Sequence, residues 1–124
     1  MGTTLKTILV IDDDPFIRAM LRQAFEEKSF RVVEARDGDE GLDVFGAEEV
    51  DLVITDIIMP GKEGLSTIRD LLKASNGLKV IAMSGGGMTG NDYLPMAVDL
   101  GVRHTFVKPF PMNEMTSAVD DLIG

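Results

Sequence analysis

Three consecutive aspartates, Asp12 to Asp14, follow directly after the apolar run TILVI at residues 7–11. Neighbouring carboxylates repel one another: at about 4 Å and an effective dielectric constant near 20, each ionised pair costs on the order of 4 kcal/mol. Carboxylate oxygens are also the ligands that hard cations prefer, and Mg²⁺ typically binds one or two carboxylates together with phosphate oxygens. A bound divalent cation would offset the repulsion, so these aspartates indicate a candidate metal site.

Three further residues with reactive side chains stand at or near the ends of other apolar runs. Asp56 ends DLVITD, Ser84 ends KVIAMS, and Lys108 stands near the end of HTFVKP. An aspartate can act as a nucleophile towards a phosphoryl group and form an acyl phosphate. An ammonium and a hydroxyl group can stabilise negative charge on the phosphoryl oxygens. Each residue alone also has a structural explanation, because aspartates often cap helices and lysines usually lie at the surface.

Short apolar runs alternate with amphipathic stretches along the whole chain. Runs that are apolar at every position are typical of strands buried on both faces, and apolar residues spaced by three and four are typical of helices. The predicted strands are 7–11, 31–35, 51–56, 79–84 and 104–109, and the predicted helices lie within 15–30, 38–49, 64–75, 91–101 and 111–124. Five strand–helix units in succession predict an α/β fold, with helices on both faces of a parallel sheet.

The order of the strands decides which strand ends are neighbours. Right-handed crossovers leave few arrangements for five parallel strands, and the doubly wound, flavodoxin-like order 2-1-3-4-5 is the natural choice. The strand at 31–35, whose end carries nothing distinctive, then lies at one side of the sheet. The aspartates after the first strand, Asp56, Ser84 and Lys108 follow the other four strands, at the carboxyl ends where ligands bind in such sheets. We therefore expect them to form one site.

Length and composition restrict the class of protein. The 124 residues suit a single domain, 1–124. The chain has no cysteine, which excludes disulfides and thiolate metal sites and fits a reducing cytoplasm. Its net charge of −9 argues against direct binding of nucleic acid, which depends on lysine and arginine. No apolar run approaches the roughly 20 residues of a membrane-spanning helix. We expect a cytoplasmic protein that binds neither nucleic acid nor membrane.

Four motifs resemble those of one protein family. ILVIDDDP, DLVITDIIMPGKEG, VIAMSG and FVKPF are similar to the motifs of the receiver domain in two-component response regulators, and the resemblance covers essentially the whole chain. It implies that Asp56 accepts a phosphoryl group from a phosphohistidine on a sensor histidine kinase or a histidine phosphotransfer protein. It implies a signalling phosphoacceptor, which catalyses only its own phosphorylation and dephosphorylation and is not otherwise an enzyme. A downstream protein partner and a monomer, or a weak phosphorylation-dependent dimer, are expected.

The resemblance also implies a cofactor and its ligands. Mg²⁺, with Mn²⁺ as an alternative, would be bound by Asp13, Asp56 and the backbone carbonyl of Ile58, while Asp12 would act mostly through a metal-bound water. Asp14 stands before a proline, the residue favoured at the first position of a helix, so we predict that it caps the first helix instead.

Further residues match the family motif around the acceptor. Ser84 matches the hydroxyl residue that turns towards the phosphoryl group, and Lys108 matches the lysine that pairs with the acceptor or its phosphate. The Lys108–Pro109 peptide is expected to be cis, which only bonds before proline tolerate at low cost. Pro60 and Gly64 match residues that shape the loop after the acceptor.

The aromatic residue of the fifth strand departs from the family pattern. Receivers usually carry tyrosine or phenylalanine three residues before the lysine, as a rotating switch, but this chain has Thr105 there and Phe106 one place on. The alternation of side chains along a strand places Phe106 on the opposite side. Either Thr105 supports a muted switch, or the output is read elsewhere.

Other α/β families share some of these features. DDDPF offers the Asp12-x-Asp14 pattern of a haloacid dehalogenase-type phosphohydrolase, but Phe16 stands where that motif has threonine or valine. A flavin-binding relative of the flavodoxins is disfavoured, because the acidic cluster would repel the flavin phosphate. The glycines within 85–90 formally match a dinucleotide-binding pattern, but that interpretation leaves the aspartates unexplained.

Overall fold

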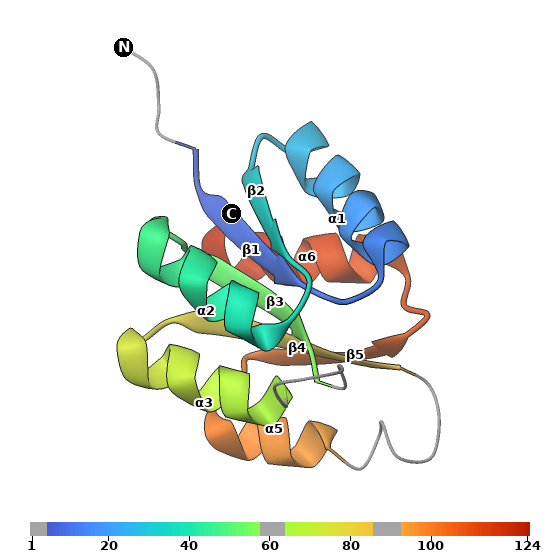
Figure 1. Cartoon of the computed structure of the whole chain (residues 1–124). Coiled ribbons are helices and arrows are strands. Elements are labelled where there is room, and N and C mark those ends of the chain that lie inside the picture. Colours follow the sequence, from blue (N-terminus) through green and yellow to red (C-terminus); the bar gives the residue numbers. More distant parts are fainter. Residues whose placement is uncertain (1–4, 58–63, 86–92) are drawn as a thin grey trace.

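Five parallel strands form one sheet in the computed structural model, which describes residues 5–57, 64–85 and 93–124 (Figure 1). The strands lie in the order β2-β1-β3-β4-β5, so the predicted order is confirmed. They are β1 (Thr7–Ile11), β2 (Arg31–Ala35), β3 (Leu52–Asp56), β4 (Lys79–Gly85) and β5 (His104–Lys108). Because every neighbouring pair is parallel, all five carboxyl ends lie at the same end of the sheet.

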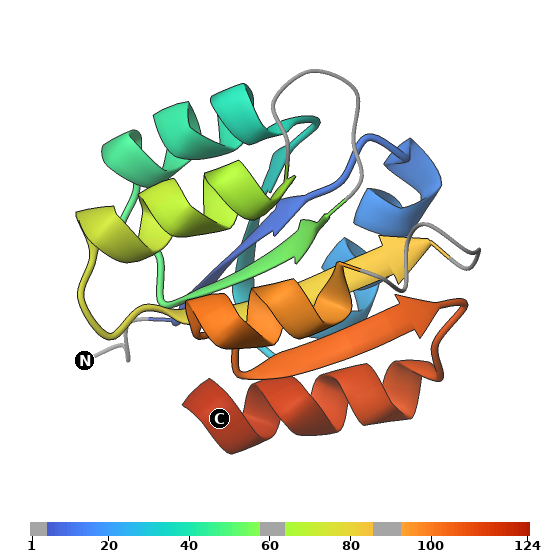
Figure 2. The ribbon, with the colours of Figure 1, turned by 90° about the horizontal axis from the view of Figure 1, so that it is seen from below.

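In the part of the chain that the structure describes, five helices cover the two faces of this sheet and alternate with the strands (Figures 1 and 2). They are α1 (Pro15–Glu27), α2 (Gly38–Ala47), α3 (Gly64–Ala74), α5 (Leu94–Leu100) and α6 (Met112–Ile123). Helices α1 and α6 pack on one face, and α2, α3 and α5 pack on the other. The predicted α/β class is confirmed. None of these helices is long and apolar enough to cross a bilayer.

Two hydrophobic clusters hold the layers together, one on each face of the sheet. Strands β1 and β3 bury all their residues, because helices cover both of their faces. Side chains alternate along each strand, so Ile8 and Val10 pack on the α1/α6 side, while Leu9 and Ile11 pack on the opposite side. Burial of this kind contributes roughly 25 cal/mol per Å² of apolar surface removed from water. The strand ends are thereby fixed relative to one another.

The ends of several elements follow from local backbone geometry. Helix α1 ends at Glu27 rather than near residue 30, because Ser29 has a φ of 69°, which does not continue a right-handed helix. Gly101, with a φ of 114°, terminates α5, as glycine in the left-handed region commonly does. The Lys108–Pro109 peptide after β5 is cis, as predicted.

Asp14 is the N-cap of α1, which confirms its predicted local role. Its backbone is extended, with φ −86° and ψ 111°, and its carboxylate accepts a hydrogen bond of 2.8 Å from the N–H of Phe16. Pro15 follows as the first helical residue, where its missing N–H costs nothing. The third aspartate of the run therefore satisfies a backbone N–H in the first turn of α1 that has no partner within the helix.

Replacing this cap should weaken the fold without affecting the neighbouring aspartates. We expect Asp14→Ala to lower the free energy of unfolding by about 1 kcal/mol, measured by urea denaturation without divalent cations. Asp43→Ala is the matched control, since Asp43 is exposed in the interior of α2 and caps nothing. Equal stabilities of the two variants would show that the cap contributes little.

Candidate functional site

Strand alternation brings Asp12, Asp56 and Lys108 to the same side of the sheet. Asp12 continues the alternation of Ile8 and Val10 in β1, whose side chains pack on the α1/α6 side. Asp56 ends β3 on that same side, and Lys108 ends β5 two residues after Phe106, which packs there as well. Three residues far apart in the sequence thus converge because their strands are parallel and their positions have the same parity.

The Lys108 ammonium lies between two buried carboxylates. Its Nζ donates to Oδ2 of Asp12 at 2.6 Å and to Oδ2 of Asp56 at 3.1 Å. Asp12 is fully buried, Asp56 is 4% exposed, and the Lys108 side chain is 17% exposed. The sequence predicted that Lys108 pairs with Asp56, but the shorter contact is with Asp12. Charge-assisted hydrogen bonds of this kind are among the strongest in proteins.

Burial and charge act in opposite directions on this cluster. Burial raises the pKa of Asp12 above its usual value, and the hydrogen bonds from Lys108 and from the N–H of Asp14 only partly oppose that rise. For Lys108, burial acts to lower the pKa, but the carboxylates of Asp12 and Asp56 together outweigh it, so the pKa is raised. Lys108 is therefore a fixed positive charge at neutral pH.

A third carboxylate completes an oxygen-rich cluster. Asp13 is exposed, and one ligand atom from each of Asp12, Asp13 and Asp56 lies within 4.8 Å of the others. Oxygen donors of this type suit Mg²⁺ or Mn²⁺, so the donor set fits the cofactor that the sequence implied. Ile58, the expected source of a carbonyl ligand, lies outside the described residues.

Ser84 and Thr105 lie on the other side of the sheet. Ser84 is fully buried, continues the alternation of Val80 and Ala82, and donates its hydroxyl to the carbonyl of Gly85 at 3.2 Å. Thr105 pairs in register with Ala82. Among the described residues, the Lys108 ammonium donates to Asp12 and Asp56 and makes no hydrogen bond to the side chain of Ser84 or Thr105. The structure does confirm that Phe106 lies opposite Thr105, packed in the α1/α6-side core.

The loop-shaping residues are described only in part. Gly64 donates its N–H to the carbonyl of Ile57 at 3.0 Å, and a Cβ at this position would overlap the backbone of Ile57. Only glycine fits this close approach. Pro60 lies outside the described residues, as do two of the three glycines of the dinucleotide-binding pattern.

A charged network beside the site was not predicted from the sequence. The end of β2 was interpreted as carrying nothing distinctive, but Glu34 accepts hydrogen bonds from both Arg18 and Arg22 of α1. Arg18 also donates to the backbone carbonyl of Asp12 at 2.7 Å. The available signal was the spacing of the two arginines, four residues apart on one helix face.

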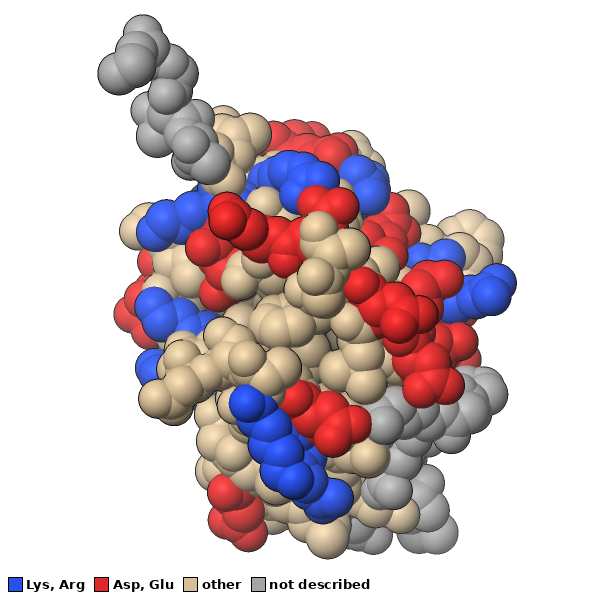
Figure 3. Space-filling model, turned by 60° about the vertical axis from the view of Figure 1, so that its left-hand side comes forward, with Lys and Arg blue, Asp and Glu red and all other residues tan. Residues whose placement is uncertain are grey.

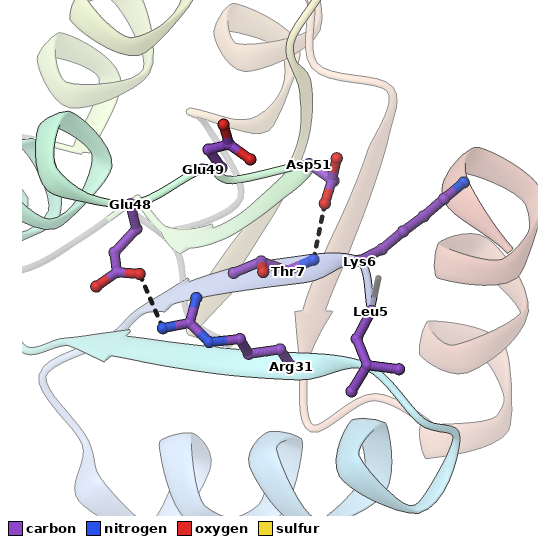
Figure 4. A pocket seen from close by; sticks show the side chains of 7 residues that line it. All are labelled: Leu5, Lys6, Thr7, Arg31, Glu48, Glu49 and Asp51. Carbon is purple, nitrogen blue, oxygen red and sulfur yellow. Dashed lines mark hydrogen bonds and ion pairs between the residues drawn. The ribbon is translucent and has the colours of Figure 1, made fainter. Parts of the chain in front are cut away.

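A hollow at the opposite end of the sheet is less suited to phosphoryl chemistry. It has a volume of about 670 Å³ and lies at the amino ends of the strands (Figure 4). Arg31 in its wall is paired with Glu48 at 2.8 Å, and Asp51 accepts from the N–H of Thr7 at 2.8 Å. These groups satisfy one another, whereas the carboxyl end has a surplus of carboxylates.

Charged side chains are mixed over the surface. On the face that Figure 3 shows, lysine and arginine lie in separate groups among acidic side chains. This distribution, with a net charge of −9, gives no support to binding of a nucleic-acid backbone, which requires clustered basic residues.

The chain is similar to proteins of one family over nearly its whole length. A sequence profile described as "Response regulator receiver domain" matches residues 8–120. Sporulation initiation phosphotransferase F of Bacillus subtilis (strain 168) is 30% identical over 112 residues, which cover 90% of this chain and 89% of the relative. Protein CcdB of the same organism is 34% identical over 118 residues, covering 94% and 97%. The structure of response regulator protein TrrA from Thermotoga maritima, in complex with Mg(2+)-BeF, has a TM-score of 0.84 at 31% identity, covering 96% and 100%.

These similarities do not support the haloacid dehalogenase-type alternative. In that alternative Asp12 would be the nucleophile, but Asp12 is fully buried. One of its carboxylate oxygens accepts from the N–H of Asp14 and the other from Lys108. A nucleophile held in this way is poorly placed to attack a substrate.

The interactions of Glu34 with Arg18 and Arg22 should make the stability of the fold depend on pH, because they require an ionised Glu34 carboxylate. Burial acts to raise the pKa of Glu34, but the hydrogen bonds and charges of Arg22 and Arg18 lower it below its usual 4.5. The stabilisation is therefore fully present above pH 4.5 and is lost as the pH falls through the lower pKa of the folded state. We expect Glu34→Gln to be less stable than wild type by up to about 1 kcal/mol at pH 7, with the difference shrinking below pH 4.5.

Urea denaturation across this pH range, without divalent cations, measures the effect. The control is Glu49→Gln, since Glu49 is exposed at the other end of the sheet. A stability difference for Glu34→Gln that does not vary with pH would contradict the ionic explanation.

Proposed function

The chain belongs to the response regulator receiver family of two-component signalling, and from that premise we propose that Asp56 is its phosphoacceptor. The observation that carries the proposal is the position of the Lys108 ammonium, 3.1 Å from Oδ2 of Asp56, beside a second and a third carboxylate. Asp12 is fully buried and holds hydrogen bonds at both oxygens, whereas Asp56 retains slight exposure. The position of Asp56 in DLVITD supports the same choice.

The reaction is a transfer between two side chains. A carboxylate oxygen of Asp56 attacks the phosphorus of a phosphohistidine; the new P–O bond forms as the P–N bond breaks, and the electron pair of that bond stays on the leaving imidazole. The product is an acyl phosphate at Asp56. Lys108 supplies a fixed positive charge next to the acceptor and would pair with the transferred oxygens.

The acidic cluster would hold the divalent cation that such a transfer requires. Asp12, Asp13 and Asp56 supply hard oxygen donors, and bound Mg²⁺, or Mn²⁺ in its place, would neutralise charge on the phosphoryl oxygens. The backbone carbonyl of Ile58 is the further ligand that we propose. Asp12, whose side chain is occupied by Lys108, would act through a metal-bound water.

The donor and the readout follow from the family. The phosphodonor is a sensor histidine kinase or a histidine phosphotransfer protein, and the output passes to a protein partner or along a phosphorelay in the cytoplasm. Phosphorylation adds nearly two negative charges, which shifts the equilibrium between two conformations. Ser84 would turn towards the phosphoryl group, with Thr105 in place of the usual aromatic switch. The protein would act as a monomer or a weak phosphorylation-dependent dimer, and not as an enzyme on separate substrates.

Labelling with a small phosphodonor tests the acceptor. We expect acetyl phosphate with Mg²⁺ to label the wild-type protein stoichiometrically, and Asp56→Asn to abolish the label, because the amide is not a nucleophile. Intact-mass spectrometry measures the label. Asp43→Asn, which changes an exposed aspartate of α2, should be labelled like wild type. Full labelling of Asp56→Asn, or steady release of phosphate in place of labelling, would reject the proposal.

Removing Asp13 tests the cation site. We expect Asp13→Ala to weaken Mg²⁺ binding by at least about tenfold and to remove the Mg²⁺-dependent rise in melting temperature that mass action gives the wild type. Without Mg²⁺ the variant should be no less stable than wild type, because one repelling charge is gone. Isothermal titration calorimetry and thermal denaturation measure the two effects.

Asp14→Ala is the control for this experiment. It changes the adjacent residue and lowers stability through the helix cap, and it should bind Mg²⁺ as tightly as wild type. If both variants lost the same affinity for Mg²⁺, the proposal that Asp13 rather than Asp14 binds the cation would be wrong.

A further inference from the structure

Arg18 connects the acidic loop to the neighbouring strand. Its Nη1 donates to the backbone carbonyl of Asp12 at 2.7 Å, and its Nε donates to the Glu34 carboxylate at 3.0 Å. The side chain is only 19% exposed. A guanidinium that is mostly shielded from water and holds two different acceptors has a defined orientation, because its donors are fixed in one plane.

The position of Arg18 in α1 explains this reach. Arg18 is the fourth residue of α1. The N–H of Arg18 donates the first backbone hydrogen bond of the helix, to the carbonyl of Asp14 at 3.2 Å. Helical side chains lean towards the N-terminus, so the guanidinium extends back over the loop. A cation near the positive end of a helix is electrostatically unfavourable for the helix itself. Helix stability therefore does not explain an arginine here.

Arg22, one turn further along, anchors the same carboxylate. It donates to the other oxygen of Glu34 and to Glu26 at 3.0 Å, so it ties α1 to β2 by itself. What distinguishes Arg18 from Arg22 is the contact with the loop. Arg22 already attaches α1 to β2, so the hydrogen bond from Arg18 to the Asp12 carbonyl is not needed for that attachment. This contact therefore points to a role in the site.

Arg18 fixes the peptide that leads into Asp13. The N–H of Asp12 donates to the carbonyl of Ala35 at 3.1 Å, and the carbonyl of Asp12 accepts from Arg18. The second of these groups belongs to the peptide plane between Asp12 and Asp13. Rotation of that plane would move the Asp13 side chain, which is exposed and has no core packing to hold it. The direction of the Asp13 carboxylate therefore depends on the contact from Arg18.

We propose that Arg18 is a positioning residue for the cation site: by holding the Asp12 carbonyl, and being held itself by Glu34, it keeps the Asp13 carboxylate directed at the cation shared with Asp12 and Asp56. The inference rests on the proposed function, because it assumes that these carboxylates bind Mg²⁺. It assigns Arg18 no contact with the phosphoryl group.

Two arginine substitutions on the same helix face test this role. Arg18→Met keeps the length of the side chain and removes its donors, and Arg22→Met does the same one turn away, where the lost partners are Glu34 and Glu26 only. Both variants lose an ion pair to Glu34, so both should lose similar stability in urea without divalent cations. Only Arg18→Met should raise the dissociation constant for Mg²⁺, by roughly tenfold, as loss of an outer-shell partner typically does. Arg22→Met should stay within about twofold of wild type.

Calorimetric titration with Mg²⁺ gives the affinities directly, and labelling by acetyl phosphate gives a second readout. In Arg18→Met the Mg²⁺ concentration for half-maximal labelling should rise, while the labelling rate at saturating Mg²⁺ stays near that of wild type. A merely structural role would not raise the Mg²⁺ concentration for half-maximal labelling while leaving the rate at saturating Mg²⁺ unchanged. Arg18→Lys, which keeps a charged donor, should recover part of the affinity.

Each outcome decides the matter. Equal weakening of Mg²⁺ binding in Arg18→Met and Arg22→Met, or weakening in neither, overturns the proposal. If Arg18→Met does not fold, the same comparison between Arg18→Lys and Arg22→Lys decides it. Failure of the wild-type protein to bind Mg²⁺ or to be labelled would reject the proposed function instead, so the two failures are distinguishable.

Discussion

The contact of one ammonium with two buried carboxylates holds the carboxyl end of the sheet together. Lys108 donates to both Asp12 and Asp56, and without it these two buried acidic groups would lose the positive charge that they share. Breaking a buried pair in this way typically costs 3–5 kcal/mol. With Asp13 included, the cluster still has two more negative charges than positive ones. In the proposed function, a divalent cation would balance that surplus, and a phosphoryl group would then enter a site whose charges are already arranged for it.

The fold supplies this arrangement through parallel strands rather than through nearby sequence. Strands β1, β3 and β5 end at the same place, and Asp12, Asp56 and Lys108 project to one side because each continues its strand with the same parity. Fully buried strands in the centre of the sheet leave little freedom to their ends. The loop between β1 and α1 carries Asp13, and the Arg18–Glu34 network ties that loop to the edge strand β2.

The parts of the structure that sequence reasoning predicted correctly depend on local signals. Unbroken apolar runs marked the strands, and an aspartate before a proline marked the α1 cap. Connection rules left few strand orders, and the flavodoxin-like order was chosen among them as the natural one. The contact between Arg18 and the Asp12 carbonyl was not predictable, because it depends on how far an arginine reaches across a loop. For the same reason Glu34 looked like an ordinary strand residue, although the two arginines spaced by four gave a hint. The preference of Lys108 for Asp12 over Asp56 also required the packed geometry.

Locating the phosphoryl group on the wild-type chain tests the central claim most directly. Borohydride reduces an acyl phosphate of aspartate to homoserine, which peptide mass spectrometry places at a single position. After incubation with acetyl phosphate and Mg²⁺, the account predicts homoserine at position 56 and at no other aspartate, and no conversion when Mg²⁺ is removed by a chelator. Homoserine at position 12 or 13, or equal conversion without a divalent cation, would contradict it.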